Sequence, residues 1–154
     1  SFTATCQEVK DGSALFFMDD CVADMPMNRE ATNEGGFEAS DLCAWIQERL
    51  APAFKALYGD RLQYVTIPTR EQVFGKDEYS KNYESLGGEQ LPLQKIRQNR
   101  VCSDPEGDWD WYWLQNRHLK YASDFALVYS YGNSNGNLAS AAGGVRPAFA
   151  LTDR

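Results

Sequence analysis

The residues best suited to acid–base or nucleophilic chemistry lie close together near the C-terminus. His118 is the single histidine among 154 residues, and Ser123 and Asp124 follow it closely. A serine, a histidine and an aspartate form a nucleophilic triad when a rigid frame fixes their geometry. Here they fall in a polar stretch rich in tyrosine and asparagine, where a fixed catalytic geometry is not expected. We therefore predict no catalytic residue and a protein that is not an enzyme.

Four cysteines, Cys6, Cys21, Cys43 and Cys102, are spread along the chain without any close pair. Zinc sites and thiol redox motifs usually have two cysteines a few residues apart. A domain of this size also does not need disulfide bonds to fold. The expected state is reduced, structural cysteines.

An acidic turn carries oxygen ligands of the kind that Ca²⁺ prefers. Asp104, Glu106, Asp108 and Asp110 occupy alternate positions of this turn. A solvated acidic turn is the commoner use of such a pattern, so we predict no metal site and no cofactor. The sequence leaves open whether residues 104–110 bind calcium.

Non-covalent recognition is the chemistry that the segment 115–142 indicates. Tyrosine rings and small polar groups give binding surfaces their contact area at low entropic cost. The predicted anchors are Tyr121, Tyr129 and Tyr131. The full set of candidate binding residues is Arg117, His118, Tyr121, Ser123, Asp124, Leu127, Tyr129, Tyr131, Asn133, Ser134, Asn135, Asn137, Leu138 and Ser140.

Two apolar stretches, residues 109–114 and 143–149, flank this segment and are predicted to be its rigid frame. Within the segment, Phe125 and Val128 are expected to face the core. Arg146 lies between apolar residues, and a guanidinium there can tie several loop carbonyl groups at once. We predict a structural role for it.

The first half of the chain predicts the elements beneath this frame. Asp11-Gly12 is a hairpin turn between strands 2–9 and 13–18. Residues 25–36 have no periodicity and are predicted to be a surface loop. Ser40 is the expected N-cap of a helix that ends before Pro52, with a further helical turn over 53–58.

The second half predicts mainly short strands. We expect strands at 62–67, 109–114, 125–131 and 145–151, with turns at 104–108 and 132–136. Thr69 and Gln72 have the spacing of a capping box for a short helix that ends at Gly75. Residues 76–89 are predicted to be a loop, and 91–100 a loop or an irregular strand. These patterns predict a single α+β domain over residues 1–154, with short antiparallel strands and two helices.

Charge and hydropathy exclude several classes of partner. The net charge is −7, and no clustered basic face of the kind that binds phosphates is visible. We therefore predict no nucleic-acid partner. No run of 18 apolar residues is present, and the N-terminus lacks the pattern of a signal peptide, so no membrane insertion is expected.

Five motifs occur in an order that resembles one bacterial and phage domain family. They are residues 40–46 (SDLCAWI), 67–75 (IPTREQVFG), 99–100 (NR), 112–114 (YWL) and 144–149 (GVRPAF). The family has no assigned function, looks like a set of C-type-lectin-fold proteins, and includes many that resemble variable proteins of diversity-generating retroelements. The resemblance covers residues 15 to 151, and the pairing of YWL with GVRPAF is its most specific part.

The resemblance implies a C-type-lectin-like fold and a receptor-recognition surface that adenine-directed mutagenesis diversifies. Asparagine codons then become many residue types, but not Lys, Gln, Glu, Met or Trp. The candidate binding residues are reachable in this way. Gln115 and Lys120 are not, so they are either fixed or derived from another template codon.

The partner implied is an unknown protein or cell-surface ligand, and the location a phage particle or a bacterial cell surface. An oligomer is compatible with these expectations. The C-type-lectin fold is also similar to that of formylglycine-generating enzymes, but Cys102 has no second cysteine near it in sequence. The main alternative is a fixed structural or tail-fibre-type interaction module.

Overall fold

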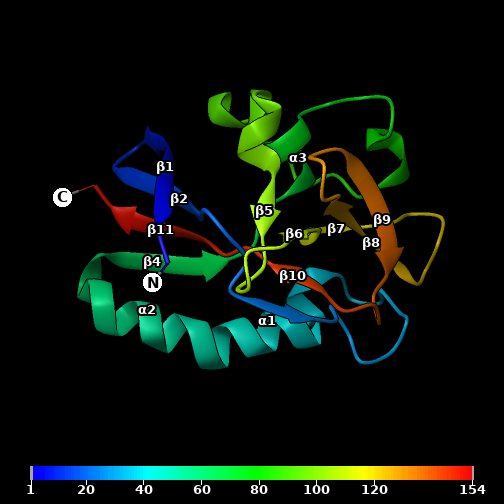
Figure 1. The fold of residues 1–154 in the computed structure, drawn as a ribbon, viewed down its shortest axis with the longest axis horizontal. Coiled ribbons are helices and arrows are strands. Elements are labelled where there is room, and N and C mark those ends of the chain that lie inside the picture. The colour runs from blue at the N-terminus through cyan, green and yellow to red at the C-terminus, as the bar shows by residue number, and fades with distance from the viewer. Residues whose placement is uncertain (1, 154) are drawn as a thin grey trace.

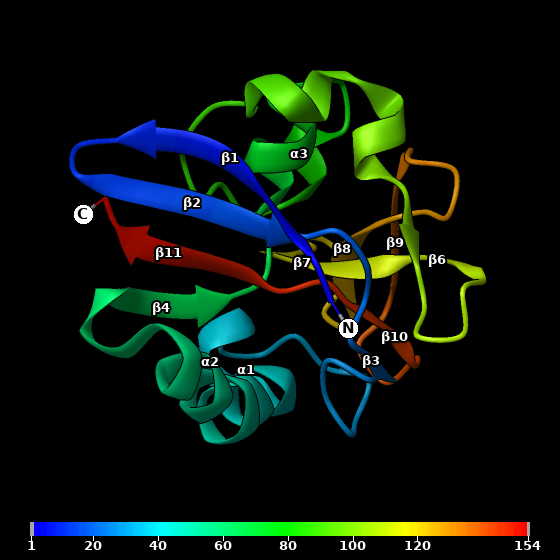
Figure 2. The ribbon, with the colours of Figure 1, turned by 60° about the vertical axis from the view of Figure 1, so that its left-hand side comes forward.

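The computed structural model describes residues 2–153, which fold into an α+β domain of mainly antiparallel strands (Figure 1). This confirms the predicted class. The strands form two larger sheets and one two-stranded sheet. A long helical segment lies on one side of the molecule and a short helix on the other (Figure 2). Within the described residues, no helix combines the length and the apolar character needed to cross a membrane.

The first sheet has the strand order β1-β2-β11-β4 and is antiparallel throughout. Its strands are β1 (Ala4–Lys10), β2 (Ser13–Met18), β11 (Ala148–Thr152) and β4 (Leu62–Thr66). The predicted hairpin is confirmed, because Asp11 and Gly12 both have positive φ, 53° and 78°, as a type I′ turn requires.

The second sheet has the order β3-β10-β7-β8-β9. Its strands are β3 (Ala23–Met25), β10 (Gly143–Val145), β7 (Tyr112–Arg117), β8 (Asp124–Val128) and β9 (Ser134–Leu138). Only the contact between β10 and β7 is parallel among these pairs of the described strands. The third sheet pairs β5 (Cys102–Ser103) with β6 (Trp109–Asp110) around the predicted acidic turn.

Several strand boundaries differ from those predicted. The strand at 109–114 breaks at Trp111, and the strand at 125–131 ends at Val128. The turn predicted at 132–136 lies at 129–133, so that 134–138 form β9. The closing strand at 145–151 is two strands in different sheets, because the chain leaves the second sheet at Arg146-Pro147, and proline has no N–H to donate.

The long helical segment starts at the predicted N-cap, where Ser40 Oγ accepts the Cys43 N–H at 3.0 Å. It comprises α1 (Asp41–Trp45), a π-helical turn (Ile46–Leu50) and α2 (Ala51–Tyr58). The predicted end before Pro52 is therefore wrong. Within the π turn the Ala51 N–H bonds to the Ile46 carbonyl, and such wider turns accommodate the bond that proline cannot make.

Helix α3 (Arg70–Phe74) has the predicted capping box of Thr69 and Gln72, and it ends at Gly75. Residues 91–100 are neither loop nor strand but two 3₁₀ turns, Pro92–Lys95 and Arg97–Arg100. Further 3₁₀ turns lie at Phe37–Ala39, Gly59–Arg61 and Ser80–Asn82.

Both faces of the second sheet are covered, which creates two cores. Strand side chains alternate between faces, so Phe125 and Leu127 of β8 join one core, while Ala126 and Val128 join the other. The first core is completed by the long helical segment, whose Phe54 ring meets that of Phe149 at 4.9 Å between centroids. The second sheet therefore exposes its edge strand and its loops to solvent, and not a whole face.

Candidate functional site

The candidate binding residues do not all share one surface. Leu127 is 3% exposed and belongs to the core, so its assignment to the binding set is wrong. It follows Phe125 by two positions, and the period of a strand places both on the same buried face. Arg117 pairs with Glu84 at 3.5 Å and lines a separate hollow with Gly35 and Gly36.

One group of exposed residues forms an aromatic patch, defined here as Trp109, Tyr129 and Tyr131. The Trp109 and Tyr131 rings meet edge to face with centroids 5.7 Å apart, and Tyr129 and Tyr131 lie at the same separation. Trp109 is 66% exposed, although the sequence predicted it as part of the rigid frame. The strand that carries it breaks at Trp111, which leaves only the later residues in the core.

An open groove of about 550 Å³ runs beside this patch. The residues that line it are Arg97, Gln98, Val101, Trp109, Ser130 and Tyr131. The 3₁₀ turn Arg97–Arg100 forms one wall, and the turn between β8 and β9 forms the other. Segments far apart in sequence thus build a hollow with an aromatic rim.

The turn at 129–133 is held by two arginine side chains that donate hydrogen bonds to its backbone carbonyl groups. Arg97 Nε donates to the Tyr131 carbonyl at 2.6 Å, and Arg100 Nε donates to the Gly132 carbonyl at 2.8 Å. Gly132 has a φ of 86°, and a Cβ there would lie 3.1 Å from the Arg97 carbonyl oxygen. Gly132 is therefore a fixed position inside an otherwise exposed turn.

The loop at 118–123 is contacted by one residue, Asn33, of the segment predicted to be a surface loop. Asn33 is buried, and its Nδ2 lies within 3.1 Å of the carbonyl oxygens of His118, Tyr121 and Asp124. Its own N–H donates to the Ala122 carbonyl at 2.7 Å. The 25–36 segment is thus partly buried, contrary to the prediction, because it supports this loop.

His118 is used structurally in this loop. Its Nδ1 accepts the N–H groups of Lys120 and Tyr121 at 3.0 and 3.1 Å. Its ring packs between Tyr83 and Tyr121, with centroids at 4.9 and 4.7 Å. The Ser123 hydroxyl donates to Asp124 at 2.8 Å, so the geometry of a nucleophilic triad is not assembled here.

Strand β9 lies at the edge of its sheet, and it covers its own outer hydrogen-bonding groups. The side-chain oxygens of Asn135 and Asn137 accept the N–H groups of the following residues, Gly136 and Leu138, at 2.8 and 2.7 Å. Exposed edges invite pairing with another chain unless they are blocked. A Cβ at Gly136 would lie 2.6 Å from the Tyr83 hydroxyl, so a side chain there would displace the Tyr83 ring.

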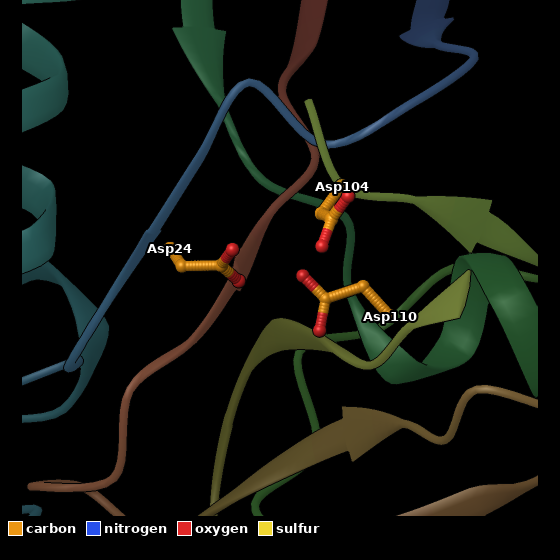
Figure 3. Close-up of side chains that lie close together, drawn as sticks. All are labelled: Asp24, Asp104 and Asp110. Carbon is orange, nitrogen blue, oxygen red and sulfur yellow. The ribbon is translucent and has the colours of Figure 1, made fainter. Parts of the chain in front are cut away.

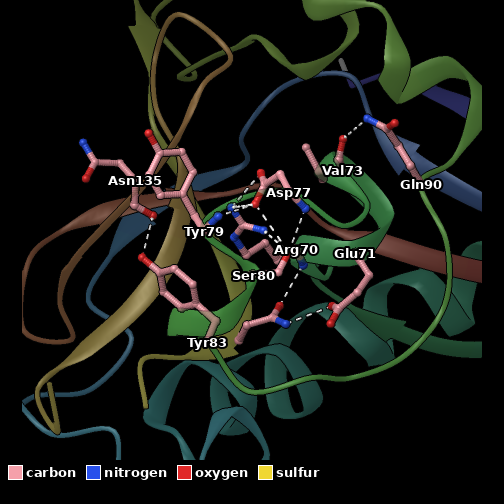
Figure 4. Close-up of polar contacts among 10 residues, drawn as sticks. Arg70, Glu71, Val73, Asp77, Tyr79, Ser80, Tyr83, Gln90 and Asn135 are labelled. Carbon is pink, nitrogen blue, oxygen red and sulfur yellow. Dashed lines mark hydrogen bonds and ion pairs between the residues drawn. The ribbon is translucent and has the colours of Figure 1, made fainter. Parts of the chain in front are cut away.

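A buried polar network joins this region to α3 (Figure 4). Arg70 is 3% exposed, and its Nη2 lies 2.9 Å from the Asp77 carboxylate. Burial opposes ionisation of Asp77, but the hydrogen bond and charge of Arg70 outweigh it and lower the Asp77 pKa. The buried Asn116 accepts the Arg70 N–H at 2.7 Å and donates to Glu71 at 2.9 Å.

Gln115 also serves the framework. Its Nε2 donates to the Ile67 carbonyl at 2.7 Å and to Thr66 Oγ1 at 3.1 Å. Gln115 therefore has a structural role in the framework.

Within residues 2–153, the acidic residues that could hold a divalent cation form two groups. Carboxylate oxygens of Asp24, Asp104 and Asp110 lie within 4.8 Å of one another (Figure 3). The carboxylate oxygens of Asp104, Glu106 and Asp108 lie within the same distance of one another. Asp104 Oδ1 also accepts the N–H groups of Glu106 and Asp108, at 2.9 and 3.0 Å. Burial and the neighbouring carboxylates of Asp24 and Asp104 raise the pKa of Asp110 to about 7.

The four cysteines are free, and the fold brings two of them together. Cys21 and Cys102 are buried, and the hydrogen bond that the Cys21 thiol donates to Cys102, together with burial, raises the pKa of Cys21. Beside them, the buried Arg146 has the predicted structural role. Its guanidinium donates to the Met18 carbonyl at 2.7 Å, the Tyr112 hydroxyl at 2.9 Å and the Asn99 carbonyl at 3.2 Å.

No family model, curated protein or solved structure matches the chain. The geometry alone therefore identifies the site. It adds Arg97, Gln98, Val101 and Trp109 to the exposed predicted residues. In the sequence, the only signal for this wall of the groove is the run of basic and amide residues at 95–100. That run does not indicate which residues it faces in the fold.

Proposed function

We propose that this chain is a non-catalytic ligand-binding protein with a C-type-lectin-like scaffold. Its binding surface consists of the aromatic patch, the exposed side chains of β9 and the 118–123 loop. The observation that carries the proposal is a division of labour. The exposed rings of Tyr129 and Tyr131 lie against each other, while side chains distant in sequence, those of Asn33, Arg97 and Arg100, bind the backbone carbonyls of the loop and the turn.

Such a division suits a surface that tolerates substitution, because main-chain contacts do not depend on the side chains they support. We further propose that the surface is a product of adenine-directed retroelement mutagenesis, with an unknown protein or cell-surface ligand as partner. A phage particle or bacterial cell surface is the corresponding location. The fixed structural or tail-fibre-type module is the competing function, for which an oligomer burying the same residues would be expected.

Two displayed libraries test the scaffold part of this proposal without a known ligand. Both are selected for protease resistance and then sequenced. The first randomises exposed residues, namely Tyr121, Tyr129, Tyr131, Asn133 and Ser140. The second randomises framework residues of the same region, namely Asn116, Phe125, Leu127, Gly132 and Gly136.

We expect most of the first library and almost none of the second to resist protease. Equal loss in both libraries would contradict a substitution-tolerant surface. Diversification is tested separately by deep sequencing of the encoding locus in a growing population. Substitutions at exposed codons, with none at Gly132 or Gly136 and a nearby imperfect repeat, are expected. A uniform locus without such a repeat would favour the fixed module.

A further inference from the structure

The groove beside the aromatic patch differs in charge from the rest of the molecule. The chain carries a net charge of −7, but residues 91–101 contain Lys95, Arg97 and Arg100 and no acidic residue. No acidic side chain lines the groove among the described residues. Arg97 is the charged side chain in the lining of the groove, so an anionic group that enters it meets positive charge, while Asp108 and Asp110 flank the lining residue Trp109 in sequence.

Arg97 has the capacity to bind such a group. Its Nε is engaged with the Tyr131 carbonyl, whereas its two terminal nitrogens make no hydrogen bond to any residue in 2–153, and no carboxylate there pairs with it. A guanidinium with both terminal nitrogens free matches the fork of a carboxylate. The bond through Nε also restrains its position before a ligand arrives.

The other side of the groove is aromatic and aliphatic. Trp109 and Tyr131, both more than half exposed, form the rim with Val101. Large aromatic rings that remain exposed next to a hollow are typical anchors for an apolar side chain of a partner. The hydrogen bonds from Arg97 and Arg100 to the carbonyls of Tyr131 and Gly132 fix this wall of the groove before a ligand binds. A wall that is already ordered lowers the entropic cost of binding.

From this juxtaposition we propose that the groove binds a segment of a partner protein that carries an aromatic or branched aliphatic side chain next to a carboxylate. The apolar side chain lies against Trp109 and Tyr131, and the carboxylate pairs with Arg97. This inference rests on the proposed binding function and adds its ligand chemistry. It also makes Arg97 and Trp109, outside the 115–142 segment, constant contacts beside variable ones.

Three dipeptides test the proposal, acetyl-Trp-Glu-amide and its Gln and Lys counterparts. Each is titrated into ¹⁵N-labelled protein, and amide signals of Ser130 and Tyr131 and the Trp109 indole N–H are followed. We expect millimolar binding, with the Glu peptide about twofold to fivefold tighter than the Gln peptide, as for one partly exposed charge pair. The Lys peptide should bind most weakly.

Arg97→Glu should reverse the order of the Glu and Lys peptides, and Trp109→Ala should weaken all three. Arg49→Gln, on the exposed side of the long helical segment, is the control for net charge when compared with Arg97→Gln. The backbone spectrum of each variant checks that it folds. Equal affinities in the wild type, or a Glu preference that survives Arg97→Gln, would overturn the proposal.

Three further outcomes separate this inference from the proposed function. If the peptides bind without charge preference and Tyr129→Ala/Tyr131→Ala weakens them, the surface binds ligands but Arg97 does not select them. If no peptide shifts any groove signal while methyl β-glucoside does, the groove is a sugar site and the peptide proposal fails. If nothing binds and the exposed library also unfolds, the binding function itself fails.

Discussion

Strands β8 and β9 pair residue by residue, from Asp124 with Leu138 to Val128 with Ser134. Phe125, Ala126, Leu127 and Val128 of β8 are all buried, whereas no side chain of β9 is. The two strands therefore share backbone hydrogen bonds and differ in everything that side chains contribute. A polar stretch of sequence can thus contain a core strand and a display strand side by side, and only position in the sheet separates them.

The largest expected effect on stability comes from comparing a leucine-to-alanine substitution on β8 with the same substitution on β9. Leu127→Ala removes a fully packed side chain and should lower the free energy of unfolding by about 2–4 kcal/mol. Leu138→Ala, on a side chain that is 47% exposed, should change it by less than about 0.5 kcal/mol. Urea unfolding of both variants measures this difference. Similar losses would mean that β9 is packed against something in solution.

A smaller loss is expected where the framework meets the 118–123 loop. Asn33→Ala leaves the carbonyls of His118, Tyr121 and Asp124 without their shared donor, which should cost about 1–3 kcal/mol. Amide exchange should increase within the loop and not in β9. Asn133→Ala, an exposed asparagine of the β8–β9 turn, serves as the control. Unchanged protection in Asn33→Ala would show that the loop is held by other contacts.

The residues in these two tests differ from the local motifs in how far the sequence predicts their roles. The hairpin at Asp11-Gly12, the cap at Ser40 and the capping box at Thr69 were predictable, because each depends on neighbours in sequence. The roles of Asn33 and Trp109 were not, because their contacts lie far along the chain. Leu127 was misplaced for a related reason, since alternation gives a face but not whether that face is covered. The groove wall at Arg97 needed the fold to bring it to the turn.

The edge of β9 should respond in association and not in stability. Asn135→Val with Asn137→Val removes the oxygens that cover the Gly136 and Leu138 N–H groups. The monomer should keep its melting temperature within about 2 °C while self-association rises, because an uncovered, apolar edge pairs with another strand. Sedimentation over a range of concentrations measures it, with Asn135→Asp/Asn137→Asp as the covered control. Monomers in both variants would contradict a blocked edge.

The smallest expected effect is the pH dependence of stability that the Asp110 carboxyl group contributes. Its pKa is raised in the folded state, so its protonation stabilises the fold below about pH 4, and that contribution is lost as pH rises through 7. Partial exposure screens the effect. The melting temperature of the wild type, relative to Asp110→Asn, should therefore fall by about 2 °C between pH 5 and pH 8. Asp108→Asn is the control, and an equal pH dependence there would assign the effect to the whole turn.

Asn33 recognises its loop only through main-chain atoms, three carbonyl oxygens and one further carbonyl that accepts its N–H. Such a contact is indifferent to which side chains the loop carries, but it depends on the number of residues between His118 and Asp124. An insertion or deletion there would move at least one carbonyl out of reach, whatever residue was added. Beyond His118, whose ring accepts two N–H groups of the loop, the loop can therefore change in composition but not in length, and variation in this region should consist of replacements without gaps.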